Sequence, residues 1–326
     1  MKEYKRITVF EREEISIRIE QKVSIRTIAK HLGRSSSTIS RELSRHHEKG
    51  VYRAIIAQEK VRKKLKATKR SKLEKNPELF NFVYKRMIEN KWTPEQVAKR
   101  LKILYPKDMK MRISHETIYR YVYVKAKSTL KKELVGSLRR KHKNRKSRKT
   151  RHKSCPIQDY VSIEQRPQEV QDRLIPGHWE GDLIMGKDNK SAIGTLVERT
   201  ARLTIISKLK EKNAEAVRKA FAKEFEKVPE GLKKSLTYDQ GQEMAQHKIF
   251  TKETKIQVYF AHPHSPWERG TSENTNALIR QFFPKGTDFN KVTEKELKRV
   301  QELLNDRPRK VHDFYTPNEV FNKVLQ

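Results

Sequence analysis

Three carboxylates in the second half of the chain have the residue type and the setting for metal-assisted chemistry. Asp182 stands in HWEGDLIMG and Asp239 in SLTYDQGQE, each delivered by an apolar, strand-like run. Glu273 stands in SPWERGTSENTNALIR, on a helical pattern that follows a Pro-Trp turn. A carboxylate delivered by an apolar strand is costly to bury unless it is paired or bound to a metal. Three such acids converging on one point would suit two divalent metal ions and phosphoryl transfer.

Spacing alone leaves the choice of acids open. Glu180 points to the same strand face as Asp182 and is the main rival for a ligand role. Glu243 and Glu268 are further neighbours in sequence, and we expect both to be exposed. Hard cations such as Mg²⁺ prefer oxygen ligands, keep several waters and need only one or two carboxylates each. We therefore expect a site of two ions, with the three acids named first as ligands.

The elements that must position these acids follow from hydrophobic periodicity. From about residue 175, three β-like runs follow one another: HWEGDLIMG, SAIGTLVERT and RLTIISKLK. NAEAVRKAFAKEFEKV is an amphipathic helix, and SLTYDQG and IQVYFAH are two more strands around a short helix at 241–252. A last helix covers 267–282. The order β-β-β-α-β-α-β-α predicts an α/β fold, a mixed sheet with helices packed on it as in ribonuclease H. If the strands of Asp182 and Asp239 are neighbours, their carboxylates meet.

Charge is divided unevenly along the chain. The 326 residues carry a net charge of +35. Residues 1–155 contain 46 Lys and Arg against 15 Asp and Glu, a net of +31, whereas residues 156–326 contain 29 against 25, a net of +4. So large an excess of positive charge repels itself unless a polyanion binds. DNA is a better candidate for this polyanion than a membrane surface or ribosomal RNA. The first half is therefore expected to bind DNA, and the second to carry the chemistry.

Cysteine usage and hydropathy bound the compartment. Cys155 is the single cysteine, so neither a disulfide within the chain nor a cysteine-rich zinc site can form. No apolar run approaches the length of a membrane span, and MKEYKRITVFEREE has no signal-peptide core. We expect a soluble protein of the cytoplasm.

Residues 8–46 have the pattern of a helix-turn-helix. Thr8 and Glu11 form a capping box, Ser24 caps a second helix that stops at Gly33, and a third helix starts at Ser35 or Ser36. The third helix would read the major groove. A small helical bundle without DNA contacts has the same apolar stripe, but the polar face and the charge favour DNA. We expect residues 1–50 to form this domain, with five DNA-contacting residues: Arg34, Ser36, Ser37, Thr38 and Arg41.

A second DNA-binding segment is expected at 51–138. Residues 52–72 form a basic helix, which either tracks a phosphate backbone or is a solvated face. Thr93 with Pro94 starts one later helix and Ser114 caps another, as in a helix-turn-helix with a longer connection. Its expected DNA contacts are His115, Thr117 and Arg120. The stretch RRKHKNRKSRKTRHK (139–153) has no aliphatic residue, so 139–170 is expected to be a basic linker and 171–326 the catalytic domain.

Several longer segments resemble one known family. GHWEGDLI, LTYDQGQE, FAHPHSPWERGTSENTNALIRQFFPKGTDF, LNDRPRKVHDFYTPNEVF and the N-terminal GRSSSTISREL look like the DDE transposases of the IS-thirty insertion-sequence family. The resemblance implies a retroviral-integrase-like fold and cutting and joining of the element's ends with Mg²⁺ or Mn²⁺. It assigns Asp182, Asp239 and Glu273 to the catalytic positions. The family often has Gln at Glu268 and Asn at Ser272, and neither departure touches the triad.

Residues near the triad have further expected roles. Arg280 lies two helical turns after Glu273 and is expected to bind a phosphate near the cut, with a solvated side chain as the alternative. Asn274 and Asn276 flank the glutamate and would orient it or touch DNA. Trp267 either stacks on a base or packs in the core.

These observations lead to a functional hypothesis. We expect a transposase that binds the terminal inverted repeats, cuts a strand to leave a 3′-OH, and transfers that strand. Two ends must be held together, so a dimer or larger assembly is expected, acting in the bacterial cytoplasm at the nucleoid. The alternatives are a non-catalytic DNA-binding regulator of the element and a nuclease without strand joining.

Overall fold

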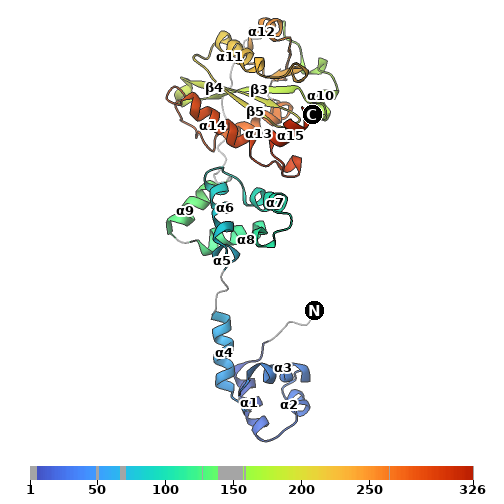
Figure 1. Ribbon diagram of the computed structural model, residues 1–326, viewed down its shortest axis with the longest axis vertical. Coiled ribbons are helices and arrows are strands. Elements are labelled where there is room, and N and C mark those ends of the chain that lie inside the picture. The colour runs from blue at the N-terminus through green and yellow to red at the C-terminus, as the bar shows by residue number, and fades with distance from the viewer. Residues whose placement is uncertain are drawn as a thin grey trace. The chain divides into compact units, whose positions relative to one another are not determined.

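The computed structural model describes residues 6–48, 51–66, 71–126, 128–138, 157, 159–263 and 265–325. Two compact units divide the chain, residues 1–70 and residues 71–326, and each is considered by itself (Figure 1). The basic stretch at 139–153, expected to be a linker, lies outside the described residues. No helix in the described ranges is long and apolar enough to cross a membrane.

The first unit begins with the three helices expected from the sequence. They are α1 (Val9–Glu20), α2 (Ile25–His31) and α3 (Ser36–His46). Thr8 and Glu11 form the expected capping box, and Ser24 accepts a hydrogen bond from the backbone of Thr27. Gly33 has φ +62°, a left-handed conformation that glycine adopts without strain, and it turns the chain between α2 and α3. Local capping chemistry therefore sets the three helix starts and the turn.

A small hairpin and a fourth helix complete this unit. They are β1 (His47–Glu48), β2 (Val51–Tyr52) and α4 (Ala54–Lys66). Ile15, Ile28, Ile39, Tyr52 and Ala57 form a buried core that joins all four helices. The unit therefore extends past residue 50, where the sequence placed a boundary. Strands of two residues have too little alternation to be read from sequence.

The second unit starts with a helical cluster. Its helices are α5 (Lys72–Lys75), α6 (Pro77–Ile88), α7 (Pro94–Leu104), α8 (His115–Arg120) and α9 (Ser128–Ser137). Thr93 and Ser114 cap α7 and α8, as the sequence indicated. Ten residues connect α7 to α8, including a 3₁₀ turn at Met109–Met111. The second helix pair is thus part of a bundle with its own core.

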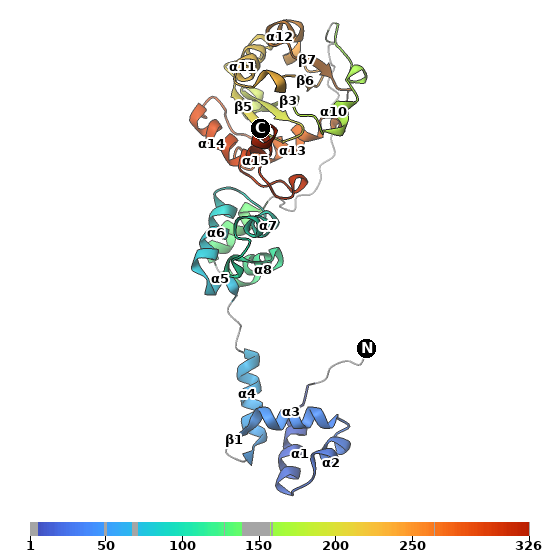
Figure 2. The same ribbon diagram turned by 45° about the vertical axis from the view of Figure 1, so that its right-hand side comes forward.

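A five-stranded sheet forms the centre of the rest of this unit (Figure 2). Its strands are β3 (His178–Met185), β4 (Ala192–Glu198), β5 (Thr204–Lys208), β6 (Ser235–Tyr238) and β7 (Gln257–Phe260). They lie in the order β5-β4-β3-β6-β7. β3, β4 and β5 are antiparallel, whereas β6 is parallel to both β3 and β7. The strands that lead to Asp182 and Asp239 are therefore neighbours, the condition under which their carboxylates can meet.

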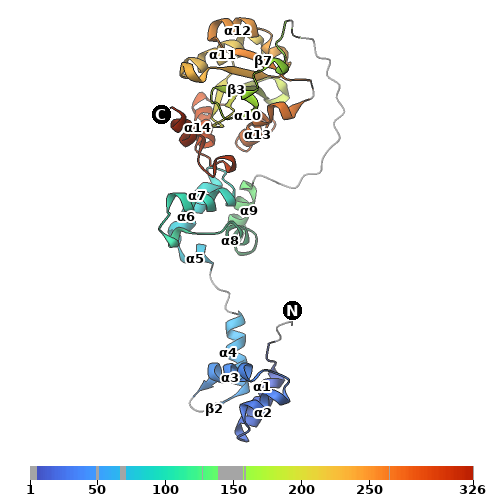
Figure 3. The ribbon, with the colours of Figure 1, turned by 90° about the vertical axis from the view of Figure 1, so that its right-hand side faces the viewer.

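Helices cover both faces of this sheet (Figures 1 and 3). α11 (Ala214–Glu226) and α12 (His247–Thr254) lie on one face, and α13 (Gly270–Ile279) and α14 (Glu294–Asn305) lie on the other. Successive strand residues alternate between the two cores: Ile205 packs towards α11, and Ile206 packs with residues of α13 and α14. α15 (Pro317–Val324) is the last helix among the described residues. The expected element order and α/β ribonuclease H-like fold are confirmed.

The segment before β3 packs on the sheet as well. It contains a 3₁₀ turn at Ile163–Gln165 and α10 (Glu169–Asp172). Ser162 forms a parallel bridge with Phe260 at the sheet edge, and Arg166 donates a hydrogen bond to the hydroxyl of Thr237 at 3.0 Å. The globular part therefore begins before residue 170, where the sequence had ended the linker.

Candidate active site

β3 and β6 bring two acids to one end of the sheet. Their parallel register pairs Glu180 with Thr237, so Asp182 and Asp239 each lie two residues further along. Side chains alternate along a strand, and Gly181 and Tyr238 face each other on the α11 side. Asp182 and Asp239 therefore point to the other side of the sheet, towards α13.

Arg269 joins the two aspartates. Its Nη2 donates a hydrogen bond to Oδ2 of Asp239 at 2.9 Å, and its Nη1 lies 3.4 Å from Oδ1 of Asp182. Nη1 also donates to the carbonyl of Gly181 at 3.1 Å. The Arg269 side chain is mostly buried. Arg269 is the last residue of the 3₁₀ turn Pro266–Arg269, which leads into α13. One cation thus contacts both carboxylates and offsets part of their negative charge.

Asp182 is held by three further groups. The amide of Asn276, on α13, donates to its Oδ2 at 2.7 Å, and the backbone N–H of Leu183 donates to its Oδ1 at 3.0 Å. The hydroxyl of Thr195, on β4, lies 3.1 Å from both the carbonyl of Asp182 and Oδ1 of Asn276. Asn276 is therefore fixed as a donor towards the carboxylate. The sequence flagged this asparagine, but as a partner of Glu273.

Electrostatics show that the aspartates are close enough to interact. Burial raises the pKa of Asp182, the charge of Asp239 raises it further, and Arg269 opposes both effects. Burial acts to lower the pKa of Arg269, but the charges of Asp239 and Asp182 more than compensate and raise it. Two carboxylates sharing one cation form a donor set of hard oxygens, which suits a divalent ion.

Glu273 does not reach the aspartates in this structure. It lies in the first turn of α13 and its side chain is exposed. Among the described residues, no cluster of three acidic, histidine or cysteine side chains is close enough to hold a metal. Asn276, three residues further along α13, contacts Asp182. Helix positions i and i+3 are neighbours about 5–6 Å apart, so a rotation of the Glu273 side chain would bring its carboxylate near.

Glu180, the rival ligand, is a structural residue. Its side chain is fully buried and accepts a hydrogen bond from Arg199 at 2.9 Å. Its second oxygen accepts from the backbone N–H of Ser272 at 2.8 Å, in the first turn of α13. Both carboxylate oxygens are thereby occupied. Glu180 thus ties α13 to the sheet, and each of its oxygens already has a donor inside the protein.

The expectation that Glu243 and Glu268 are exposed is wrong. Glu268 is mostly buried because its oxygens accept hydrogen bonds from the backbone and the ring of His262, each at 2.8 Å. Glu243 is partly buried, and burial followed by the charge of Asp239 raises its pKa. Glu243 thus adds a third negative charge beside the two aspartates, which sequence spacing did not reveal.

The third helix of the first unit presents a polar face. Ser36, Ser37 and Arg41 are exposed, Thr38 is partly buried, and Ile39 is fully buried in the core. The hydroxyls of Ser37 and Thr38 lie 3.0 Å and 2.7 Å from that of Ser35, the cap of α3. Sequence reasoning missed three more exposed residues of this helix: Ser40, Ser44 and Arg45. Continuing the 3.6-residue period from Ser37 and Arg41 would have found them.

Arg34 differs from this group. Its guanidinium makes two hydrogen bonds to Glu11 at 2.8 Å and 3.1 Å. The hydrogen bond from Arg34 lowers the pKa of Glu11 to about 2. The side chain predicted to contact DNA is therefore engaged with the capping-box acid of α1, and its DNA contact stays a prediction.

The predicted contacts of the second helix pair lie on and around α8. Arg120 is exposed, whereas His115 and Thr117 are partly buried. The hydroxyl of Thr117 lies 2.8 Å from that of Ser114, the cap of α8, and His115 lies 3.4 Å from Glu116. All three stay predictions as DNA contacts, with Arg120 the most accessible.

Arg280 and Trp267 flank the acids. Arg280 donates to the carbonyl of Met185, at the end of β3, at 2.5 Å, and its guanidinium lies over the ring of Phe289. It therefore links α13 to the sheet, and its phosphate contact stays a prediction. Trp267 is 72% exposed, which excludes the alternative that it packs in the core.

The fold and the paired aspartates define a class: a ribonuclease H-like catalytic core of the integrase type, preceded by a helix-turn-helix. Comparison with known families agrees. The helix-turn-helix domain family matches residues 3–46, and the integrase core domain family matches residues 174–266. The second match includes Asp182 and Asp239 and ends before Glu273.

Full-length relatives identify the family. The chain is 40% identical to the transposase for insertion sequence element IS1086 of Cupriavidus metallidurans, over 99% of this chain and 96% of the relative. It is 41% identical to transposase InsI for element IS30A of Escherichia coli, over 97% and 83%. The transposase for element IS4351 of Bacteroides fragilis is 35% identical, over 98% and 97%. The chain belongs to the IS30 (IS-thirty) family of insertion-sequence transposases.

Solved structures give a more distant similarity. The catalytic core domain of BIV integrase has a TM-score of 0.36 and 18% identity, over 45% of this chain and 95% of that one. A simian T-cell lymphotropic virus intasome chain has a TM-score of 0.37 and 17% identity, over 44% and 54%.

Proposed function

We propose that this transposase binds the terminal inverted repeats of its insertion sequence and catalyses metal-dependent strand cleavage and strand transfer. The observation that carries the proposal is the pairing of Asp182 and Asp239 across β3 and β6 in an integrase-type core. The family membership agrees with it, because the relatives are described as transposases of insertion sequences.

The acids fit a divalent cation. Asp182 and Asp239 offer carboxylate oxygens that now share Arg269. Burial, with a smaller contribution from the charge of Asp239, raises the pKa of Asp182, and a second positive charge would oppose both effects. Glu273 completes the set after its side chain turns inward. Two Mg²⁺ or Mn²⁺ ions, when bound, supply Lewis acidity that favours ionisation of the attacking oxygen and neutralises charge on the leaving oxygen.

The residues around the acids prepare this chemistry. Asn276 fixes the orientation of the Asp182 carboxylate, and Arg269 keeps the pair from repelling before the substrate arrives. In the first step a water oxygen adds to phosphorus, the P–O3′ bond breaks, and the 3′ oxygen leaves as a hydroxyl. In the second step the oxygen of this 3′-OH attacks the phosphorus of another phosphodiester in line, the P–O3′ bond of that diester breaks, and its 3′ oxygen leaves as a hydroxyl with the proton that the attacking hydroxyl loses. No covalent bond to the protein forms in either step.

Recognition of the element's ends is assigned to the first unit. α3 presents Ser37, Arg41 and Arg45 on an exposed face, and serine and arginine are side chains that read base edges and phosphates. The helix pair α7–α8 is a second candidate reader, with Arg120 exposed. Because two ends must be joined, we propose a dimer or larger assembly, working on DNA in the bacterial nucleoid.

Duplexes made from the DNA that flanks the gene test the proposal. With Mg²⁺, the full chain should nick one strand of an end-containing duplex and leave a 3′-OH, whereas a shuffled duplex should stay intact. Deleting residues 1–50 should remove end-specific binding and spare a weaker, salt-sensitive binding. End-specific binding without any cleavage would instead identify a non-catalytic regulator of the element.

A further inference from the structure

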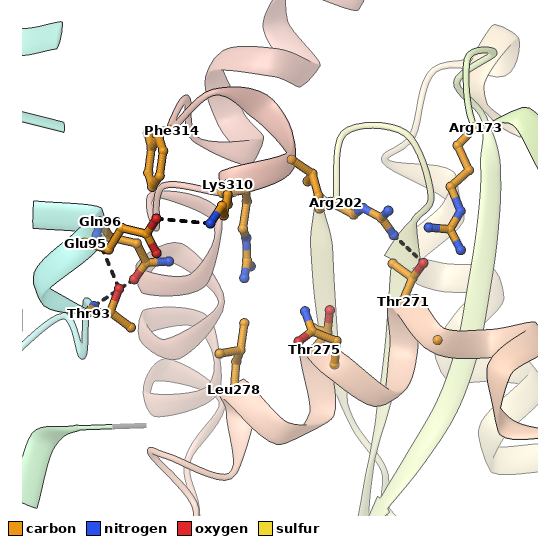
Figure 4. A pocket seen from close by; sticks show the side chains of 14 residues that line it. Thr93, Glu95, Gln96, Arg173, Arg202, Thr271, Thr275, Leu278, Lys310 and Phe314 are labelled. Atoms are coloured by element: carbon orange, nitrogen blue, oxygen red, sulfur yellow. Dashed lines mark hydrogen bonds and ion pairs between the residues drawn. The ribbon is translucent and has the colours of Figure 1, made fainter. Parts of the chain in front are cut away.

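A basic groove runs along α13 (Figure 4), and neither Asp182 nor Asp239 is among its lining residues. It has a volume of about 410 Å³. One wall is the flank of α13, and the others come from the start of α7, the loop at 309–314 and two arginines near β3 and β4. Arg202 and Arg173 lie at one end, and Lys310 and Glu95 lie at the other.

Positive charge dominates this groove. Arg173, Arg202, Arg309 and Lys310 line it, and among the described lining residues Glu95 is the single acid. Glu95 pairs with Lys310 at 3.2 Å. In the described ranges no carboxylate forms an ion pair with Arg173 or Arg202. The groove therefore carries an excess of positive charge where an anion would fit.

Arg202 shows the effect of this excess. Its guanidinium is partly buried and donates to the hydroxyl of Thr271 in the first turn of α13. Burial, followed by the positive charge of Arg173, lowers the pKa of Arg202 to about 10, although the charges of Glu180 and Glu198 act in the opposite direction. A phosphate placed between the two guanidinium groups would remove this repulsion and form charge-assisted hydrogen bonds.

The wall formed by α7 is held in place by polar contacts. Gln96 donates to the carbonyl of Pro308 at 2.7 Å and accepts from the guanidinium of Arg307 at 3.1 Å. Arg100, which is buried, donates to the carbonyl of Phe314 at 3.3 Å and forms an ion pair with Glu319. These contacts join α7 to the segment 307–319 and thereby hold this wall of the groove in place.

α13 connects this groove to the acids. Thr271, Thr275 and Leu278 lie on the groove flank, and Asn274, which also lines the groove, directly follows Glu273. Each residue turns an α-helix by about 100°, so a strand crossing the exposed side of α13 passes from Glu273 to Asn274 and then into the groove. The path needs no change of the backbone.

We infer that this groove binds the sugar-phosphate backbone of the DNA strand that leads to or from the acids. The ligand class is a phosphodiester chain read without regard to base sequence. The inference rests on the proposed function, since it needs DNA at the acids. The start of α7 thereby gains a role as one wall of a DNA channel, in addition to any part of the helix pair α7–α8 in end recognition.

A charge-matched pair of double variants tests the groove. R173Q with K310Q removes two groove cations, and K219Q with K223Q removes two exposed cations from α11, on the opposite face of the sheet. Binding of a fluorescent duplex of arbitrary sequence is measured against salt. The groove variant should lower the slope of log K against log salt by about 1.8, and weaken binding by tenfold or more at about 0.15 M salt. The α11 variant should change the slope and the affinity by less than half of these amounts.

A variant that is expected to bind DNA more tightly tests whether weaker binding by the groove variant is caused by misfolding. E95Q removes the groove acid and should tighten binding a few-fold, whereas E226Q, on α11, should not. Equal effects of the two double variants, or no tightening by E95Q, would overturn the groove. If the wild type fails to cleave any end-containing duplex, the proposed function fails. If it cleaves but the groove variants bind normally, only the groove fails.

Discussion

Arg269 lies 2.9 Å from Asp239 and donates a hydrogen bond to its carboxylate, at the point where the sheet also delivers Asp182. A cation of the protein thus lies between two acids that a divalent ion would share. Under the proposed function the arginine and the ion would compete for these oxygens. Arg269 would then stabilise the metal-free protein and would lose part of its contact with the two carboxylates when a metal binds.

Replacing this arginine should make the fold depend on metal. R269Q leaves two acids close together without a counter-charge, and losing one partner of a mostly buried ion pair costs roughly 2–4 kcal/mol. We expect a lower melting temperature without metal and a larger rise on adding Mn²⁺ than in the wild type. Thermal unfolding with and without Mn²⁺ measures both. R218Q, which breaks the remote pair with Glu253, is the control, and the same Mn²⁺ response in R269Q and wild type would refute the competition.

Glu180 should contribute to the stability of the fold and not to metal binding. E180Q leaves Arg199 buried without its carboxylate, which costs about 3–5 kcal/mol for a fully buried pair. D182N should cost less than about 1 kcal/mol without metal, since burial already disfavours its charged form. Urea unfolding midpoints compare the two. If D182N lowers the stability as much as E180Q does, the two acids would not differ in their structural role, and the assignment of Glu180 as the residue that holds α13 on the sheet would be wrong.

The first unit should lose stability in acid through Glu11. Its pKa is about 2 in the folded protein, below the ordinary value of 4.5, so the folded state binds this proton less tightly than the unfolded chain. The stabilisation is present above pH 4.5 and is lost as the pH falls towards 2. Because the pair is partly exposed, we expect about 1 kcal/mol. Urea unfolding of residues 1–70 at pH 6 and pH 3 measures it, and E11Q should flatten the difference. An equal pH response in E11Q would exclude this carboxylate as the cause.

Trp267 should contribute to catalysis without contributing to the fold. Its side chain is exposed two residues before Arg269, where an unpaired base at the cut could stack on it. Stacking of one base on an aromatic ring is worth about 1–3 kcal/mol, so W267A should slow cleavage about ten- to hundredfold. Its melting temperature should stay unchanged, and W267F should recover most of the rate. Full activity of W267A would rule out a stacking role.

Local signals in the sequence predicted much of this fold. Caps at Thr8, Ser24, Thr93 and Ser114 are read from residue types within one helical turn, and each is present. The order of strands and helices followed from periodicity, because each element repeats its burial every two or every 3.6 residues. That order left open whether the strands of Asp182 and Asp239 are neighbours, which only the sheet topology answers.

The remaining features depend on contacts between distant residues. The bridge from Arg269 to Asp182 joins positions 87 residues apart, and the one from Gln96 to Pro308 joins positions 212 apart. No periodicity encodes such pairs. The burial of Glu268 likewise depends on His262, whose position follows from the loop after β7. The exposed position of the Glu273 side chain is likewise not encoded by any periodicity.

The most direct test of the account is the cleavage of an end-containing duplex by D239N. The variant keeps the shape of the side chain and removes the charge that a metal needs. We predict that Mg²⁺-dependent cleavage falls to background while the affinity for the same duplex stays within about threefold of the wild type, since the end-reading helix is in the other unit. Undiminished cleavage by D239N would contradict the assignment of these acids to catalysis.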